Sequence, residues 1–460
     1  MPLNPLQHVK RWFRKSSRHS NVLPEPRIIP RDQHTISRKD ISRAALDVLY
    51  GLHNAGYDAY LVGGCLRDLL CGNKPKDFDV VTNATPEEII PLFRRSRLIG
   101  RRFQIVHVRF GREIIEVSTF RAMNNESSPD KQQHHAHAET GMLLRDNTWG
   151  NIQQDAMRRD FTINALYYNI ADFALYDFVG SVDAIESRQI SLIGDPPQRY
   201  REDPVRLLRA ARFAAKLDFD IAPATLAPMR EMSELLLQVP PARLFDEVLK
   251  LFLSGYGREA YAQLLQLDLL MPLFPATAAL LESSQNDVWQ RMIEEAMDNT
   301  DTRMKAGKPV NPAFIFAVML WPVVQDKLPL YRQEGMPPAQ ALHKAATRAL
   351  NKQVKHTAIP RRFSTMMREM WELQFRLDRR AGKRADQLME HPRFRAAYDF
   401  LLLREASGEL TPGLGEWWTR YQDADESQRR TMISALSQQP AGAKRKRRRR
   451  KKPSQPSSAS

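Results

Sequence analysis

Two aspartates separated by one residue, Asp77 and Asp79, follow a pair of glycines, Gly63 and Gly64. On a strand, side chains two positions apart leave the same face, so the two carboxylates would lie together. Glycine lets the backbone approach a phosphate closely because it has no side chain. Paired carboxylates suit a pair of Mg²⁺ ions that hold a triphosphate and an attacking oxygen. An Asp-x-Asp pair alone is common in turns, but its place after Gly-Gly and Arg67 predicts a phosphate-handling site.

A second charged segment, residues 158–166, reads RRDFTINAL. On a helical turn Asp160 and Asn164 would share one face, with the arginines beside them. Such a cluster could bind an anion. It could equally be a helix end with an internal salt bridge, and the segment alone leaves both interpretations open.

A third segment, residues 202–212, reads EDPVRLLRAAR. The Asp-Pro pair that begins at Asp203 is typical of a helix start, with the aspartate as the capping residue. Arg206, Arg209 and Arg212 then recur at every third position and form one slanting stripe. A solvated face is the usual explanation for such a stripe, whereas guanidinium groups also suit phosphates and base edges.

Glu116 lies inside an apolar segment, IIEV at residues 114–117, where an unpaired carboxylate would be costly. It either pairs with a neighbouring arginine or helps to hold a metal ion. A further segment, LIGRRFQIVHV at residues 98–108, predicts by itself only a turn and a strand.

The elements that must position these residues follow from the spacing of apolar side chains, which predicts an α/β half and then a helical half. Helices are expected over residues 40–54, 66–70 and 87–93. Strands are expected over residues 58–62 and 78–81, and hairpins over 103–119 and 166–178. From residue 203 the strand signals fade, and apolar residues recur at helical spacing to about residue 437.

The composition indicates the class of protein. A chain of 460 residues is too long for one ordinary core, and no stretch approaches ~18 consecutive apolar residues. The N-terminus has no apolar signal-peptide core, so we expect a cytoplasmic protein without a transmembrane segment. The basic, aromatic residues 10–15 leave peripheral membrane contact open. The two cysteines, Cys65 and Cys71, are too few for a zinc site.

The charge of the chain is strongly positive, +16 in total. An unbroken run of basic residues, 444–452, contributes much of it. Such a run cannot pack a core and is expected to be disordered. Its usual partner is a polyanion, and in the cytoplasm the first candidate for that polyanion is nucleic acid.

Five segments in this order, LVGGCLRD, KDFDV, IEVSTFR, RRDFTINAL and EDPVRLLRAARF, resemble the class II nucleotidyltransferases. That family contains the CCA-adding tRNA nucleotidyltransferases and the bacterial poly(A) polymerases. The resemblance implies an α+β fold, with a DNA-polymerase-beta-like nucleotidyltransferase head before an all-helical neck, body and leg and a disordered basic tail. The expected parts are a flexible basic N-terminal segment over residues 1–38, the head over 39–195, a neck with nucleotide-base recognition over 196–275, a helical RNA-binding body over 276–437 and the polybasic tail over 438–460.

The resemblance also implies roles for single residues. Asp77 and Asp79 would bind the catalytic Mg²⁺ ions, with Asp160 as a third catalytic carboxylate and Glu116 as a rival for that position. Nucleotide contacts would come from Gly63, Gly64, Arg67, Arg159, Asn164, Asp203, Arg206, Arg209 and Arg212.

The implied chemistry is attack of an RNA 3′ hydroxyl on the α-phosphate of a nucleoside triphosphate, with Mg²⁺ as cofactor, pyrophosphate as leaving group and no template. Asp203 and Arg206 would read the base edge, while Arg209 and Arg212 would contact ribose or phosphate. The segment LIGRRFQIVHV looks like a pattern of the bacterial poly(A) polymerases, and the basic tail would suit many RNA 3′ ends.

The expected activity is therefore addition of AMP from ATP to RNA 3′ ends, in RNA polyadenylation, mRNA processing and decay. RNA-decay or RNA-chaperone proteins are the class of protein partner that this activity suggests. Two alternatives stay open, a CCA-adding enzyme and a catalytically inactive RNA-binding adaptor.

Overall fold

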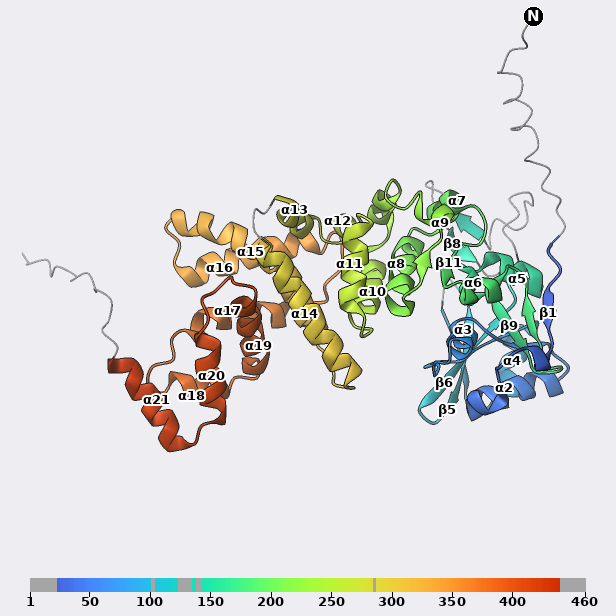
Figure 1. Ribbon diagram of the computed structural model, residues 1–460, viewed down its shortest axis with the longest axis horizontal. Helices are drawn as coiled ribbons and strands as arrows, with labels where there is room; N and C mark the ends of the chain where they lie inside the picture. The colour runs from blue at the N-terminus through green and yellow to red at the C-terminus, as the bar shows by residue number, and fades with distance from the viewer. Residues whose placement is uncertain are drawn as a thin grey trace, which may run out of the picture. The chain divides into compact units, whose positions relative to one another are not determined.

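The computed structural model describes residues 23–100, 104–122, 148–283 and 287–438, together with the backbone of 135–137 and 143–146. The chain divides into two compact units, Met1–Leu273 and Phe274–Ser460. The first contains the sheet and the motifs found in the sequence, and the second is helical (Figure 1). The segments 1–22 and 439–460, which include the basic start and the polybasic run, lie outside the described residues.

An eight-stranded sheet is the framework of the first unit, with the strand order β1-β10-β9-β2-β3-β6-β5-β4. Its strands are β1 (Arg27–Ile29), β2 (Ala59–Val62), β3 (Asp79–Thr82), β4 (Ser96–Ile99), β5 (Ile105–Phe110), β6 (Glu113–Thr119), β9 (Leu166–Asn169) and β10 (Leu175–Asp177). Neighbouring strands are antiparallel, except that β3 and β6 are parallel. Two small sheets pair β7 (His135–His137) with β8 (Leu143–Asp146) and β11 (Gln189–Ile190) with β12 (Asp220–Ile221).

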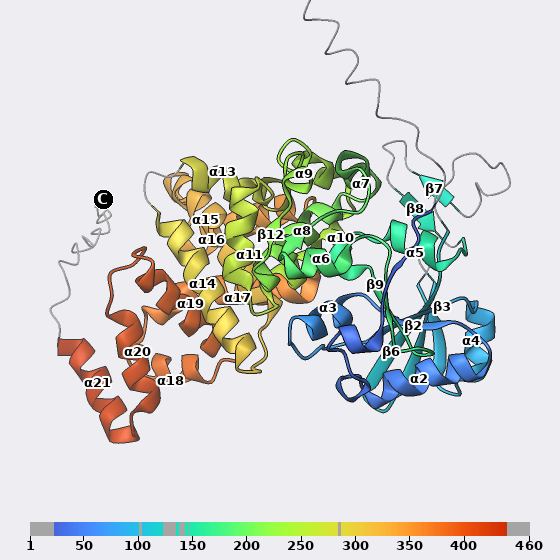
Figure 2. The same ribbon diagram turned by 45° about the vertical axis from the view of Figure 1, so that its right-hand side comes forward.

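One face of the large sheet is covered by three helices, α2 (Arg43–Asn54), α3 (Gly64–Leu70) and α4 (Pro86–Leu92). Helix α2 packs against β2, β3 and β6, whereas α4 packs against β4 and β5, and Figure 2 shows both helices beside the sheet. The apolar positions that predicted the first helix are all buried in α2, and Ser42 caps it by accepting a hydrogen bond from the backbone N–H of Ala45. The main core of the unit lies between these helices and the sheet.

The opposite face of the sheet is covered over only part of its width. Tyr60 on β2, Val81 on β3 and Tyr167 on β9 form a second, smaller core with Ala156 of α5 (Ile152–Arg158). Strands β2, β3 and β9 are therefore buried on both faces. By contrast, β6 alternates between buried and less buried residues, as a strand with one covered face does.

Three local features differ from the sequence expectations. Strand β4 was not predicted as an element of its own, and β1 lies within the segment 1–38 that was expected to be flexible. Asp160 and Asn164 do not share one helical face, because α5 ends at Arg158 and a separate 3₁₀ turn, Thr162–Asn164, follows. The predicted hairpins are confirmed as β5–β6 and β9–β10.

Helices complete the first unit after the sheet. Those from residue 181 onward are α6 (Ser181–Glu186), α7 (Pro196–Glu202), α8 (Val205–Leu217), α9 (Pro223–Leu226), α10 (Pro241–Phe252), α11 (Gly257–Gln266) and α12 (Leu270–Leu273). Short 3₁₀ turns other than Thr162–Asn164 are Arg31–Gln33, Arg38–Asp40 and Ser233–Gln238. Helix α8 packs against α10 and α11 and carries the predicted arginine stripe.

The second unit confirms the expected helical half. Its helices are α13 (Pro275–Ser283), α14 (Val288–Lys305), α15 (Pro312–Gln333), α16 (Pro338–Gln353), α17 (Arg361–Leu377), α18 (Arg384–Met389), α19 (Phe394–Ala406), α20 (Leu414–Asp423) and α21 (Glu426–Gln438). Among the described helices, α15 alone has the length and composition to cross a membrane, but 61% of its apolar window is buried. It packs against α16 and α17 as a core helix does.

Candidate active site

The glycine turn brings two oppositely charged side chains to one point of the backbone. Gly63 lies between β2 and α3 with a φ of +86°, which favours glycine. A Cβ atom there would lie 3.8 Å from Asp79 Oδ2 and 3.9 Å from the nearest guanidinium nitrogen of Arg159. The predicted Gly63, Asp79 and Arg159 are thus brought together.

Two carboxylates meet beside this turn because β3 and β6 are parallel neighbours. In that register Asp79 pairs with Glu116, and both line a cavity of about 250 Å³. Asp77 precedes the strand, so only Asp79 of the predicted pair lies within β3, and both residues are exposed. Glu116, the rival for the third carboxylate, is therefore the acid that stands beside Asp79.

Negative charge is concentrated around Asp79. Although Asp79 is exposed at the start of β3, its pKa is raised to about 6, because the surrounding protein removes part of the water from the carboxylate and because Glu116 and Asp77 add negative charge, against the opposing effect of Arg159. A bound cation would stabilise the ionised form.

The carboxylate oxygens of Asp79 and Glu116 also fit Mg²⁺. This ion takes oxygen ligands and commonly uses one or two carboxylates together with substrate phosphates. In the described part of the chain, no group of three or more acidic, histidine or cysteine side chains could enclose a metal ion by itself. Phosphate oxygens of a bound nucleotide would therefore have to complete the shell of ligands.

Three arginines, Arg121, Arg158 and Arg159, line the same cavity. Burial lowers the pKa of Arg158 to about 9, and the positive charges of Arg121 and Arg199 act in the same direction. An anion in the cavity would relieve this repulsion. The cavity is therefore lined by both carboxylates and guanidinium groups, and a metal–triphosphate complex carries charges that match both.

Arg159 is held in place by two side chains that sequence reasoning missed, Asp155 and Tyr167. Its guanidinium group donates hydrogen bonds to Asp155 Oδ2 at 3.0 and 3.2 Å and to the Tyr167 hydroxyl at 2.9 Å. That hydroxyl in turn donates to Asp155 Oδ2 at 2.8 Å. Despite burial, the pKa of Arg159 is raised by Tyr167 and Asp155. The available signal was the spacing of four residues between Asp155 and Arg159 on one helix.

Arg67 and Asn164, both predicted to contact the nucleotide, lie behind the glycine turn and do not line the cavity. Arg67 is buried, donates to Asn164 Oδ1 at 2.6 Å and donates twice to Asp68 Oδ1, at 2.9 and 2.6 Å. A Cβ atom on Gly64 would lie 3.2 Å from this guanidinium group. The pair connects α3 to the 3₁₀ turn after α5, and so supports the glycine turn.

Asp160 lies apart from the cavity lining as well. Its carboxylate accepts a hydrogen bond from Arg209 Nε at 2.6 Å and another from the backbone N–H of Phe161 at 2.8 Å. Burial raises the pKa of Asp160, but Arg209 and the backbone hydrogen bond outweigh it, and the net pKa is lowered. The structure therefore places Asp160 in an ion pair with the arginine stripe.

The stripe on α8 is not a solvated face, because each arginine meets an acid from another segment. Arg206 is 3.2 Å from Glu202, Arg209 pairs with Asp160, and Arg212 is 3.8 Å from Glu247. Their side chains are 12, 31 and 15% exposed, respectively.

Asp203, predicted as a helix cap and base reader, is bound by a guanidinium group that the sequence reasoning did not identify. Arg243 donates to its two carboxylate oxygens at 2.8 and 2.7 Å. Asp203 also accepts a hydrogen bond from the backbone N–H of Val205 at 3.3 Å, as a capping residue does. Arg206 likewise donates to the backbone carbonyl of Arg199 at 2.6 Å.

Three family models match the chain. They are described as a poly A polymerase head domain over residues 59–191, a probable RNA and SrmB-binding site of polymerase A over 218–281 and a polymerase A arginine-rich C-terminus over 334–452. These matches confirm the resemblance that the five motifs predict.

Relatives and solved structures agree with the family models. A protein from Salmonella typhi named poly(A) polymerase I is 49% identical over 92% of this chain and 91% of its own length. A CCA-adding enzyme from Lactobacillus helveticus is 33% identical over 53% of this chain and 58% of its own length. The Thermotoga maritima CCA-adding enzyme in complex with tRNA matches 87% of this chain and 96% of its own with a TM-score of 0.52. At 19% identity, that structure shows a shared fold and confirms the predicted fold class.

Proposed function

This chain belongs to the poly(A) polymerase family, and we propose that it transfers AMP from ATP to RNA 3′ ends without a template and releases pyrophosphate. The observation that carries the proposal is the cavity between β3, β6 and α5, where Asp79 and Glu116 face three arginines. That arrangement supplies both partners that a metal-bound triphosphate needs.

The charged residues at and beside the cavity divide the work in this proposal. Asp77, Asp79 and Glu116 hold Mg²⁺, and Glu116 takes the place of the third carboxylate because it is the strand neighbour of Asp79. When bound, the ion activates the attacking hydroxyl and neutralises charge on the leaving group. Arg158 and Arg159 bind the triphosphate.

Asp160 supports the site in this proposal and does not join the reaction. Its ion pair with Arg209 ties the loop after α5 to helix α8. Arg209 and Arg212 therefore brace α8, although the sequence predicted ribose or phosphate contacts for them. This assignment rests on their buried acidic partners.

Base selection is assigned to Asp203 and Arg206 at the start of α8. Arg243 and Glu202 orient these two side chains, since they bind them at 2.7 and 3.2 Å. A carboxylate and a guanidinium in fixed positions can distinguish the donor and acceptor pattern of adenine from that of other bases.

The remaining assignments concern RNA and the cell. Residues 196–275 form the base-reading neck and 276–437 the RNA-binding body, and the basic run 444–452 attracts many RNA 3′ ends. The protein works in the cytoplasm, where RNA-decay or RNA-chaperone proteins are its expected partners. An inactive adaptor is disfavoured because it would have no use for the crowded acids around Asp79.

The test is a primer-extension assay with Mg²⁺, a generic RNA that ends in A, and each nucleoside triphosphate supplied separately. Long ladders with ATP alone are the expected result. Addition of one or two nucleotides that requires CTP, and only on tRNA lacking its end, would instead indicate a CCA-adding enzyme. If the protein forms no product with any nucleotide, the result would favour the inactive RNA-binding adaptor.

A further inference from the structure

The open part of the sheet continues directly from the catalytic carboxylates. Asp79 pairs with Glu116 on β6, Glu116 pairs with His107 on β5, and His107 pairs with Arg97 on the edge strand β4. These residues form one row across four strands. With ~4.8 Å between strands, the row extends roughly 14 Å from Asp79 to Arg97.

Alternation along the strands shows which side chains share the face of this row. On β5 and β6, Val106, Val108, Ile115 and Val117 are buried in the main core. The residues between them leave the opposite face, which is the face that carries Glu116. Together with the β4 side chains in register, they form the surface that we name the β4–β6 strip: Arg97, Ile99, Ile105, His107, Arg109 and Ile114.

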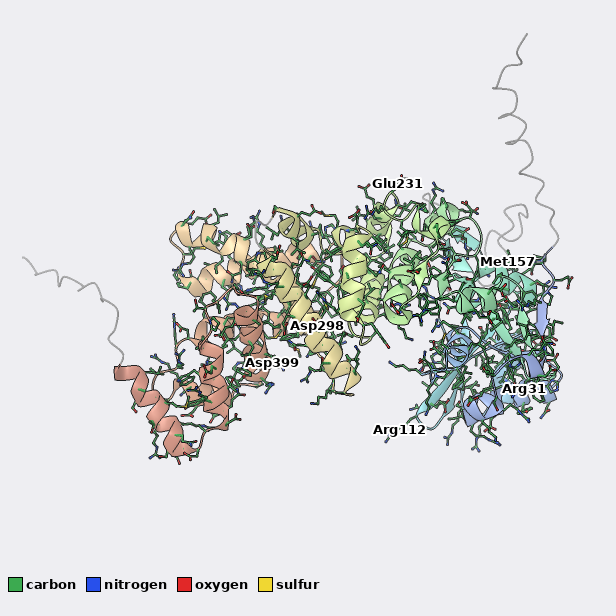
Figure 3. The ribbon with its side chains drawn as sticks, viewed as in Figure 1. Arg31, Arg112, Met157, Glu231, Asp298 and Asp399 are labelled. Carbon is green, nitrogen blue, oxygen red and sulfur yellow. The ribbon has the colours of Figure 1, made fainter. Side chains whose placement is uncertain are left out.

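Two properties distinguish the strip from the rest of the sheet. The second core, which covers β2, β3 and β9, does not include it. Ile99 and Ile114 are accordingly 39% and 44% exposed, and Arg97 and Arg109 are exposed beside them. Figure 3 shows Arg112 at the turn of the β5–β6 hairpin, pointing away from the unit.

The charge of the strip is positive. The acids of the row, Asp79 and Glu116, lie at its catalytic end, whereas Glu113 has the parity of the buried residues and binds the Ser42 hydroxyl at the start of α2. A polyanion with apolar surfaces is complementary to exposed isoleucines with arginines between them. Single-stranded RNA has that chemistry, because its bases and riboses present apolar faces and its backbone presents phosphates.

We propose that the β4–β6 strip binds the last nucleotides of the acceptor RNA and directs its 3′ hydroxyl to Asp79 and Glu116. This inference rests on the proposed function and identifies where the second substrate lies. His107 joins the two regions, since its Nε2 is 3.3 Å from Glu116 Oε1. It is a positioning residue that fixes the Glu116 carboxylate at the end of the RNA path.

The first test removes the two positive charges of the strip in the double variant Arg97→Ala/Arg109→Ala. The KM for RNA should rise about tenfold, and the salt dependence of RNA binding should become shallower by about 1.4, for two phosphate contacts on a single strand. The KM for ATP should not change. The matched control is Arg27→Ala/Arg43→Ala, which removes two exposed, ion-paired arginines from β1 and α2.

The second test does not depend on kinetics. A photo-crosslinking amino acid is placed at position 114, and a matched one at position 28, where Ile28 is a 54% exposed isoleucine on β1 at the far edge of the sheet. Crosslinks from position 114 should map to the 3′-terminal nucleotides, with few from position 28.

The two proposals fail in different ways. A wild-type protein that extends no RNA would overturn the proposed function. A wild-type protein that makes poly(A), with an unchanged KM for RNA in the strip variant or with crosslinks equal at both positions, would overturn the strip alone.

Discussion

Two groups of charged side chains in the first unit use the same residue types for different purposes. Asp79 and Glu116 line the cavity side by side, and three arginines line it as well, of which Arg159 is paired with Asp155. Along α8, each arginine meets its own acid. The neighbouring carboxylates of the cavity would be balanced by a bound cation, whereas the stripe arginines already have carboxylate partners. We therefore expect ligand binding from the cavity residues and a bracing role from the stripe.

The largest effect is expected from removing the Asp79 carboxylate. Asp79→Ala should reduce kcat for AMP transfer about a thousandfold or more, roughly 4 kcal/mol in the barrier, because the metal loses its central ligand. RNA binding should be nearly intact in a filter-binding assay. Asp47→Ala, an exposed acid on α2, is the control and should be fully active. Near-normal transfer by the Asp79 variant would refute the assignment.

The next prediction contrasts the two candidates for the third carboxylate. Glu116→Gln should reduce kcat about a hundredfold or more, as loss of a charge at the metal does. Asp160→Asn should act chiefly on stability, because it leaves Arg209 without its buried partner. Both kcat and the melting temperature are measured for each variant. A greater loss of kcat in the Asp160 variant would reverse the assignment.

A third prediction contrasts one arginine from each group. Arg158→Ala should raise the KM for ATP about 10- to 100-fold, as loss of a charged hydrogen bond does, without lowering the melting temperature, since its neighbours repel it. Arg209→Ala should instead lower stability by about 3 kcal/mol, because Asp160 would be left buried and unpaired. If both variants change the same property, the distinction between binding and bracing is wrong.

The smallest effect concerns pH and the metal-free protein. The pKa of Asp79 is raised from its usual 3.8 to about 6, so the folded state keeps a proton that the unfolded state has lost between those values. Stability should therefore fall as pH rises from about 4 to about 6, and Asp79→Asn should remove that loss.

The melting temperature of Asp79→Asn should exceed that of the wild type by at most about 2–4 °C at pH 7.5, because solvent screens the carboxylate. Near pH 4 the two melting temperatures should be equal. Asp160→Asn should change stability in the opposite direction at neutral pH, because the pKa of Asp160 is lowered in the folded state. Added Mg²⁺ should stabilise the wild type and Asp160→Asn, but not Asp79→Asn. A gain for Asp79→Asn that is equal at both pH values would show that titration of the Asp79 carboxylate is not its cause.

The sequence predicted the local elements well, since periodic apolar residues and a glycine turn act over short distances. The motif order also predicted Gly63, Asp79 and Arg159, which the fold brings together. The partners of these residues were harder to predict, because pairing depends on segments far apart in the chain. The Asp203 carboxylate is bound by Arg243, 40 positions later, and no local pattern indicates that contact.

The stripe on α8 illustrates the same limit. Spacing alone favoured a solvated face, because a helix cannot reveal what packs against it. Asp160 comes from the loop after α5 and Glu247 from α10, and both pair with stripe arginines. Strand β4 was missed because its four residues include exposed side chains and offer little apolar alternation.

The parallel pairing of β3 with β6 also has a consequence for how the protein becomes active. Asp79 and Glu116 meet only after the chain between them has crossed back through α4, β4 and β5. Non-local pairings of this kind form later than helices in most folding reactions. During refolding, helical circular dichroism should therefore return before polymerase activity does. A nascent chain released before residue 116 contains the Asp-x-Asp motif but lacks Glu116, the third carboxylate of the proposed site.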